Sequence, residues 1–151
     1  MPRTDGEIRE SLARLSGRST ALGCAAMEEL LEESRASDRV YPYLGELMAL
    51  LEADSSYTRT RALLLIAANA RWDGEGLIDG NLQRILEHIT DPKPITSRQF
   101  IAALPELARY KPELRGELVR ALEEADTGGY ADSMRPLVDR DILRALALLR
   151  E

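Results

Sequence analysis

The chain lacks most of the residues on which small secreted domains and zinc proteins depend. Its 151 residues include one cysteine, Cys24, so no disulfide can form within the chain. They also include one histidine, His88, and a single imidazole without a cysteine or a second histidine nearby does not make a zinc site. We therefore expect a protein of a reducing compartment that holds no metal ion.

Long hydrophobic runs are also missing. The longest run, Ala62 to Ala68, is far shorter than the roughly 20 apolar residues that cross a bilayer. The first ten residues carry acidic side chains and no apolar stretch, so they do not resemble a signal peptide. A net charge of -6 argues against general affinity for nucleic acid or anionic lipid. We expect a cytoplasmic protein that does not bind membranes.

Sequence motifs of catalysis are scarce as well. A Ser-His-Asp hydrolase would have to use His88, and the chain contains no Gly-x-Ser-x-Gly elbow. Gly74, Gly76 and Gly80 precede no strand, so they do not form a phosphate-binding loop. We predict no catalytic residue and no cofactor, and hence a protein that is not an enzyme.

The chain does contain residues and spacings that are typical of α-helices. Aromatic residues make up only 5% of it, whereas the helix formers Leu, Ala, Glu and Arg dominate. Thr4 and Glu7 have the spacing of a capping box. The residues around Ile66 are apolar on all sides, which predicts a buried helix, and Pro105 falls inside a later helical pattern, which predicts a kink. The sequence predicts one all-α domain.

Two segments correspond when the chain is shifted by 37 residues. Asp54 precedes Arg61 by seven residues, and Asp91 precedes Arg98 by the same interval. In both segments an apolar helix comes before the aspartate and a second apolar helix follows the arginine. A period near 40 residues built of helix, turn and helix is typical of a stacked α-solenoid.

From Ile85 to Leu104 the chain resembles a HEAT repeat, with an apolar helix, the turn Asp91-Pro92 and a second helix with an early Arg98. Residues 47–70 resemble a second copy, and residues 114–149 resemble a degenerate third copy. The whole chain is also similar to small HEAT-like proteins of bacteria. The resemblance implies a right-handed α-α superhelix, and proteins of this family usually function in protein recognition.

The resemblance also implies a division of the chain. Residues 1–40 would form an N-terminal helical cap, residues 41–73 the first repeat, residues 77–110 the second and residues 111–151 the degenerate third. We expect this solenoid to act as a non-catalytic protein-protein interaction module or scaffold that uses its concave face. Its expected partner is another protein.

The repeated charged residues have a structural interpretation. In HEAT-like stacks, Asp and Arg at these places form a hydrogen-bonded ladder inside the protein. We therefore interpret Asp54, Arg61, Asp91 and Arg98 as a structural ladder. If Arg98 pairs in the interior with Asp91 or Asp54, its loss leaves a buried carboxylate unsatisfied, at a cost of about 1–3 kcal/mol.

The 37-residue register also predicts a binding surface. If Arg61 and Arg98 are equivalent, two stripes with spacings of three and four residues line the concave face. Arg and aromatic side chains are enriched at protein contacts. The candidate partner-binding surface consists of Asn69, Trp72, Gln99, Glu106 and Arg109, all expected to be solvent-accessible on one face.

Trp72 and Asp73 keep a second function open. HEAT-like DNA glycosylases use aromatic side chains and a carboxylate in their cleft, so a nucleic-acid-processing protein of that type is the alternative hypothesis. Such proteins need a basic concave face to hold phosphates, which an acidic chain does not favour. The other interpretation is that Trp72 packs against the turn formed by residues 73–76.

Overall fold

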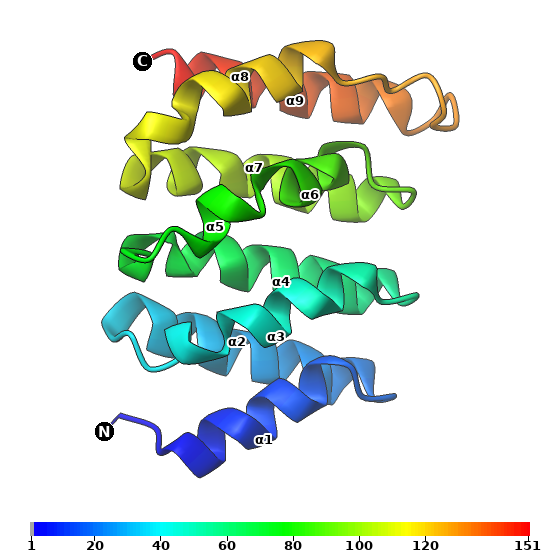
Figure 1. The fold of residues 1–151 in the computed structure, drawn as a ribbon. Coiled ribbons are helices and arrows are strands. Elements are labelled where there is room, and N and C mark those ends of the chain that lie inside the picture. Colours follow the sequence, from blue (N-terminus) through cyan, green and yellow to red (C-terminus); the bar gives the residue numbers. More distant parts are fainter. Residues whose placement is uncertain (1) are drawn as a thin grey trace. The chain divides into compact units, whose positions relative to one another are not determined.

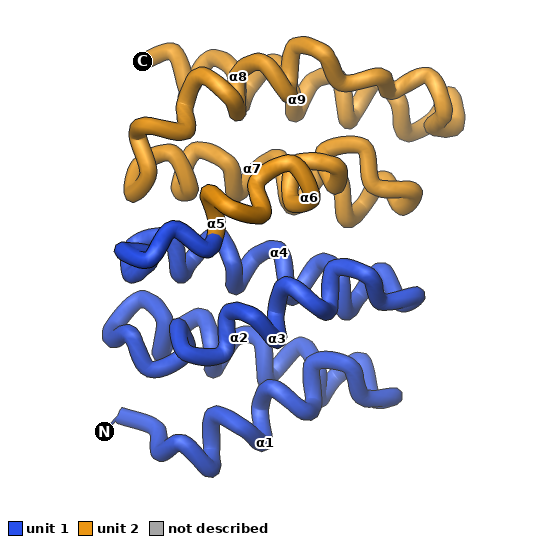
Figure 2. Tube along the Cα trace, viewed as in Figure 1, with its two compact units in different colours: residues 1–77 blue, residues 78–151 orange. Residues whose placement is uncertain are grey.

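The computed structural model describes residues 2–151, and this part of the chain is all-helical without any strand (Figure 1). It divides into two compact units, of which unit 1 extends to Leu77 and unit 2 starts at Ile78 (Figure 2). In residues 2–151 no helix is long and apolar enough to cross a membrane. The predicted all-α fold class is confirmed.

Unit 1 consists of two helical hairpins, in which α1 packs on α2 and α3 packs on α4, with α2 also packing on α4 (Figure 1). The predicted capping box is present, because Thr4 Oγ1 accepts a hydrogen bond from the Glu7 N–H at 3.2 Å and Glu7 reaches back to Thr4. The helical elements are α1 (Asp5–Leu15), α2 (Thr20–Ala36), η1 (Tyr41–Tyr43), α3 (Leu44–Ala49), η2 (Leu50–Glu52), α4 (Ser56–Ala68) and η3 (Asn69–Trp72).

Unit 2 also consists of two hairpins, in which η4, the turn after α6, packs on α7 and α8 packs on α9, with α7 packing on α9. The short α5 crosses the boundary between the units. The helical elements are α5 (Leu77–Gly80), α6 (Leu82–Leu86), η4 (Glu87–Thr90), α7 (Pro94–Tyr110), η5 (Pro112–Leu114), α8 (Arg115–Glu124) and α9 (Arg135–Leu149).

The segment between Leu77 and Ile89 is not one continuous helix, because it is divided among α5, α6 and η4. The helix α7 begins at Pro94, whose fixed φ suits a first helical turn. Near the start of this helix, the Ser97 hydroxyl donates to the Ile89 carbonyl at 2.5 Å. The helix continues through Pro105.

The first helices of the hairpins repeat one burial pattern. In the first three of them, four positions with spacings of three, one and three residues are buried. These sets are Ile8, Ser11, Leu12 and Leu15 in α1, then Leu44, Leu47, Met48 and Leu51, then Leu82, Ile85, Leu86 and Ile89. In α8 only Leu118 and Leu122 are fully buried.

The second helices repeat a pattern of their own, with buried positions separated by four, three and one residues. The sets are Ala26, Leu30, Glu33 and Ser34 in α2; Ala62, Ile66, Asn69 and Ala70 in α4 and η3; Phe100, Leu104, Leu107 and Ala108 in α7; and Val138, Ile142, Ala145 and Leu146 in α9. The helix around Ile66 is therefore buried, as predicted. Within residues 2–151 this pattern occurs four times, so residues 1–40, expected to be a cap, carry it too.

These patterns correct the 37-residue register. Between α4 and α7 the buried positions correspond at a shift of 38 residues, so Arg61 is equivalent to Gln99 and Arg98 to Thr60. One residue turns a helix by about 100°. The equal Asp-to-Arg spacings therefore do not mark equivalent positions. The sides of α4 that the 37-residue register assigns as buried or exposed are rotated by about this angle.

Candidate interaction surface

The second helix of each hairpin carries exposed and half-buried residues on the side opposite its buried positions. Spacings of three, four and seven residues place them on one stripe along each helix, which we call the outward ridge. Its members are Ala25, Glu28, Glu32 and Arg35 on α2; Tyr57, Leu64 and Arg71 on α4 and η3; Ile95, Ala102, Glu106 and Arg109 on α7; and Arg140, Arg144 and Ala147 on α9.

The helix α7 contains most of the accessible residues of the predicted surface. Gln99, beside the ridge, and Arg109 are exposed, and Glu106 is half-buried. Ile95 exposes 60% of its surface at the start of the same helix. At the other end, the Arg109 guanidinium lies 5.6 Å from the centre of the Tyr110 ring. One helix face thus combines an exposed aliphatic side chain with an arginine and an aromatic ring.

Asn69 was expected on this surface, and that prediction is wrong. Its side chain is fully buried. Its Nδ2 donates to Ser34 Oγ at 3.0 Å and to the Leu65 carbonyl at 2.8 Å. Among the residues that the structure describes, its Oδ1 has no hydrogen-bond partner. The one-residue register error explains the misplacement, because Asn69 corresponds to the buried Leu107 and not to Glu106.

Trp72 is half-buried and fastened to the preceding hairpin. Its indole Nε1 donates to the Ser34 carbonyl at 2.6 Å. In the corrected register Trp72 is equivalent to Tyr110, and Arg71 to Arg109. Both second helices therefore end in an arginine followed by an aromatic residue.

Asp73, the carboxylate beside that tryptophan, is buried and accepts two hydrogen bonds. The Tyr41 hydroxyl donates to its Oδ1 at 2.5 Å, and the Leu77 N–H donates to the same oxygen at 2.9 Å. The pKa of Tyr41 is raised, mainly because the hydroxyl is buried and secondly because it is hydrogen-bonded to this carboxylate. The carboxylate fixes the end of the second hairpin, and this geometry suits a structural role better than reaction with a substrate.

Arg61 does not belong to a ladder of Asp-Arg pairs, so that prediction is wrong for this residue. Its buried guanidinium donates to the Leu15 carbonyl at 2.9 Å and to the Thr20 carbonyl at 3.1 Å, and lies 5.7 Å from the Tyr57 ring centre. Asp54, its expected partner, is exposed. Arg61 thus satisfies the Leu15 carbonyl at the end of α1, contacts the Thr20 carbonyl at the start of α2, and joins the first hairpin to α4.

Arg98 does not join the expected ladder either. Its Nε donates to Asp141 Oδ2 at 2.6 Å, and its side chain is 37% exposed. This pair links α7 to α9 at the surface. Within residues 2–151, Arg98 thus pairs with Asp141 and not with Asp91 or Asp54.

Asp91 is buried as expected, but its partners are local. Its Oδ2 lies 2.7 Å from Nδ1 of the half-buried His88, and its Oδ1 accepts from the Lys93 N–H at 2.9 Å. The Tyr130 hydroxyl donates to the Asp91 carbonyl at 2.6 Å, and burial raises the pKa of Tyr130. These contacts hold together the turn before α7 and the loop before α9.

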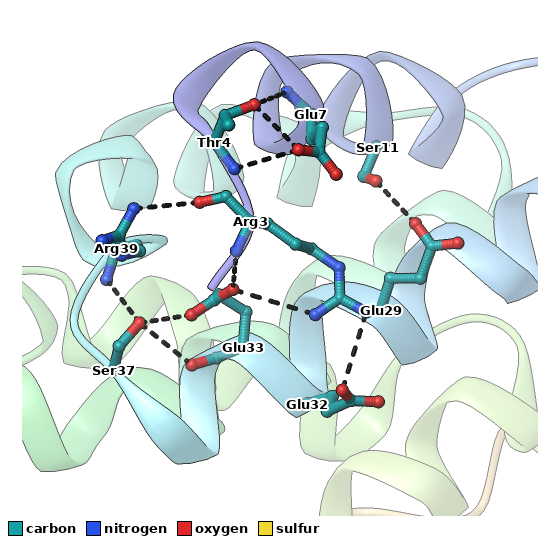
Figure 3. Close-up of polar contacts among 9 residues, drawn as sticks. All are labelled: Arg3, Thr4, Glu7, Ser11, Glu29, Glu32, Glu33, Ser37 and Arg39. Carbon is teal, nitrogen blue, oxygen red and sulfur yellow. Dashed lines mark hydrogen bonds and ion pairs between the residues drawn. The ribbon is translucent and has the colours of Figure 1, made fainter. Parts of the chain in front are cut away.

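A cavity of about 480 Å³ in unit 1 is lined by charged side chains, and these groups contact one another (Figure 3). The buried Glu33 carboxylate accepts hydrogen bonds from Ser37 Oγ at 2.5 Å and from the Arg3 N–H at 2.8 Å. These two bonds keep the pKa of Glu33 below its ordinary value of 4.5. The Arg39 guanidinium donates to the Arg3 carbonyl at 3.0 Å. The network fastens the segment before α1 to the end of α2.

Cys24 is exposed. The neighbouring Gly23 lies against the guanidinium of Arg61. Within residues 2–151 no group of three His, Cys, Asp or Glu side chains is arranged to hold a metal ion.

The sequence analysis did not single out Tyr110, Arg140 or Arg144 as surface residues. The signal that locates them is the repeated set of buried positions in the second helices, which becomes visible only when burial is known. Comparisons of the chain with models of protein families, with curated proteins and with solved structures found no match.

Proposed function

We propose that this protein is a non-catalytic interaction module built of HEAT-like helical hairpins, and that it binds another protein. The repeated burial pattern supports the proposal, because hairpins that bury the same positions expose the same positions too. In this proposal the protein needs no cofactor and works in the cytoplasm, where Cys24 stays reduced.

The single observation that carries the proposal is the accessible ridge of α7. Successive members of this ridge are separated by seven, four and three residues, from Ile95 to Ala102, Glu106 and Arg109. Spacings of three, four and seven residues are typical of the face by which one helix packs against another. The small side chain of Ala102 allows a partner backbone to come close. Ile95 at one end and the stacked pair of Arg109 and Tyr110 at the other are the residue types that anchor protein contacts.

A photo-crosslinking amino acid placed on this ridge tests the proposal in the native host. Ala102 is the best position, because it is exposed, small and central on the ridge. We expect crosslinks at Ala102 to one protein or a few, identified by mass spectrometry. The same amino acid at Arg120, which is exposed on the first helix of the last hairpin, is the matched control and should not give these products.

Substitution of Arg109 by Glu should then reduce the yield of the Ala102 crosslink without changing the thermal midpoint, because Arg109 is exposed. Identical products from Ala102 and Arg120 would exclude the ridge as the binding site. Crosslinks to nucleic acid in place of protein would support the alternative function, and a mobility shift that weakens steeply with salt would strengthen it.

A further inference from the structure

The ridge of α9 carries two arginines without a carboxylate partner. Arg140 and Arg144 are exposed and lie one helical turn apart. At the start of α9, Arg135 Nε lies 3.9 Å from Asp139 Oδ2, and just after the helix Arg150 Nη2 lies 2.9 Å from Glu123 Oε2. Within residues 2–151 no ion pair involves Arg140 or Arg144. We call these two residues the basic pair.

The ridge of α2 carries the opposite charge at the equivalent positions. Glu28 is exposed and no ion pair with a described residue involves it. Glu32, one turn later, is 77% exposed and only approaches Arg3 Nη2 at 3.7 Å. The burial patterns place Glu28 at the ridge position of Arg140, and Glu32 at that of Arg144. We call Glu28 and Glu32 the acidic pair.

The two ridges match each other when their helices run antiparallel. Glu28 then faces Arg144 and Glu32 faces Arg140, and in the same register Ala25 faces Ala147. All of these residues lie on the outward ridges, and both alanines are exposed. Two small residues allow the backbones to approach, which brings the charged side chains within reach of one another. A parallel arrangement also pairs these charges, but it places Leu137 opposite Ala25 and Arg35 opposite Ala147, so the backbones cannot approach as closely.

We propose that the chain associates with a second copy of itself, with the acidic pair on α2 of one copy seated against the basic pair on α9 of the other. This inference goes beyond the proposed function and uses other residues than those of α7. Exposed ion pairs contribute little each, so the association is weak and sensitive to salt. It places Glu28, Arg140 and Arg144, which form no ion pair within residues 2–151, and Glu32, which pairs only with Arg3, opposite groups of the opposite sign.

Analytical ultracentrifugation of the full chain over a range of concentrations tests the proposal. At low salt the average mass should rise with concentration. In about 1 M salt, where the screening length falls to about 3 Å, the association should weaken at least tenfold. The double substitution Arg140→Glu with Arg144→Glu should abolish association, and Glu28→Arg with Glu32→Arg should do the same. An equimolar mixture of the two variants should restore it, because the reversed charges match again.

Charge reversal of two other exposed arginines, Arg115→Glu with Arg120→Glu on α8, is the matched control and should leave association unchanged. Circular dichroism confirms that each variant stays folded, since all substituted side chains are exposed. A wild-type chain that stays monomeric at every concentration in low salt overturns the proposal. So does association that survives either reversal, or a mixture that stays monomeric.

The register has its own test in chains that carry Cys24→Ser. One such chain receives Ala25→Cys and another Ala147→Cys, and mild oxidation of their mixture should join the two chains. Replacing Ala147→Cys by Arg120→Cys should not give this product. Equal yields from the two mixtures would overturn the pairing of α2 with α9. The α7 crosslinking experiment is unaffected by either outcome, so the two proposals succeed or fail separately.

Discussion

Unit 1 and unit 2 fill equivalent buried positions of their second helices with different chemistry. At the third position of the repeated set, unit 1 has Glu33 and Asn69, whereas unit 2 has Leu107 and Ala145. The polar residues buried in unit 2 lie instead at helix ends and turns, as Asp91 and Lys111 do. The same pattern of buried positions therefore accepts polar or apolar side chains. We call this buried line of side chains on the second helices the seam.

The difference shows what each seam requires. A buried carboxylate or amide needs specific partners, and unit 1 supplies Ser37 and the Arg3 N–H to Glu33 and Ser34 to the Nδ2 of Asn69. An apolar seam requires only that volume be filled, which Leu107 does without any directional contact. Unit 1 should therefore respond to the loss of hydrogen bonds, and unit 2 to the loss of volume.

The largest expected effect comes from the volume of unit 2. Phe100 is 1% exposed, and the equivalent position of unit 1 is already an alanine, Ala62. Phe100→Ala should lower the free energy of unfolding by about 3–5 kcal/mol, because it leaves a cavity in a packed seam. Urea unfolding measures the effect. A loss below 1 kcal/mol would show that unit 2 tolerates a small residue there as unit 1 does.

The second prediction contrasts an arginine of each unit. Arg61→Ala removes the donors to two backbone carbonyls in the interior of unit 1, and should cost about 1–3 kcal/mol. Arg98→Ala removes a surface pair of unit 2 and should cost less than about 1 kcal/mol. The two thermal midpoints provide the measurement. Equal losses would mean that burial does not distinguish the two arginines.

The third prediction contrasts two glycines in helices. A Cβ on Gly23 would lie 2.3 Å from Arg61 Nη1, whereas a Cβ on Gly116 of unit 2 meets no atom within 4 Å. Gly23→Ala should destabilise the protein by about 1–3 kcal/mol. Gly116→Ala should stabilise it by up to about 1 kcal/mol, because alanine restricts the unfolded chain.

A double-mutant cycle sharpens this prediction. In an Arg61→Ala background the obstructing guanidinium is gone, so Gly23→Ala should lose most of its cost. Additive effects of the two substitutions would show that the contact between Gly23 and Arg61 does not limit the space.

The smallest expected effect concerns acid. Hydrogen bonds from Ser37 and Arg3 lower the pKa of Glu33 in the folded chain below its ordinary value of 4.5. A lowered carboxyl pKa stabilises the fold above pH 4.5, and this contribution disappears as the pH falls through the folded-state pKa. Between pH 7 and pH 3 the wild type should therefore lose more stability than Glu33→Gln. Unfolding at several pH values provides the measurement, and parallel losses would contradict the prediction.

Much of the fold could be predicted from the sequence, since periods of three and four residues, the capping box at Thr4 and the apolar segment around Ile66 all correspond to observed features. The candidate surface was less predictable. Gln99 and Arg109 are accessible, but Asn69 is buried, because a register taken from two Asp-Arg spacings was wrong by one residue. Because one residue turns a helix by about 100°, that small error assigns a buried residue to the exposed side of the helix.

By itself, the sequence determined that this chain is helical and where most helices begin and end, because apolar spacing, prolines and caps act within a few residues. Only the tertiary structure decided which side of each helix is buried and which charged residues find partners. Arg61 reaches carbonyls more than 40 positions away, and Arg98 pairs with an aspartate 43 positions away. Such partners are chosen by the packing of whole hairpins, and no local pattern in the chain contains that information.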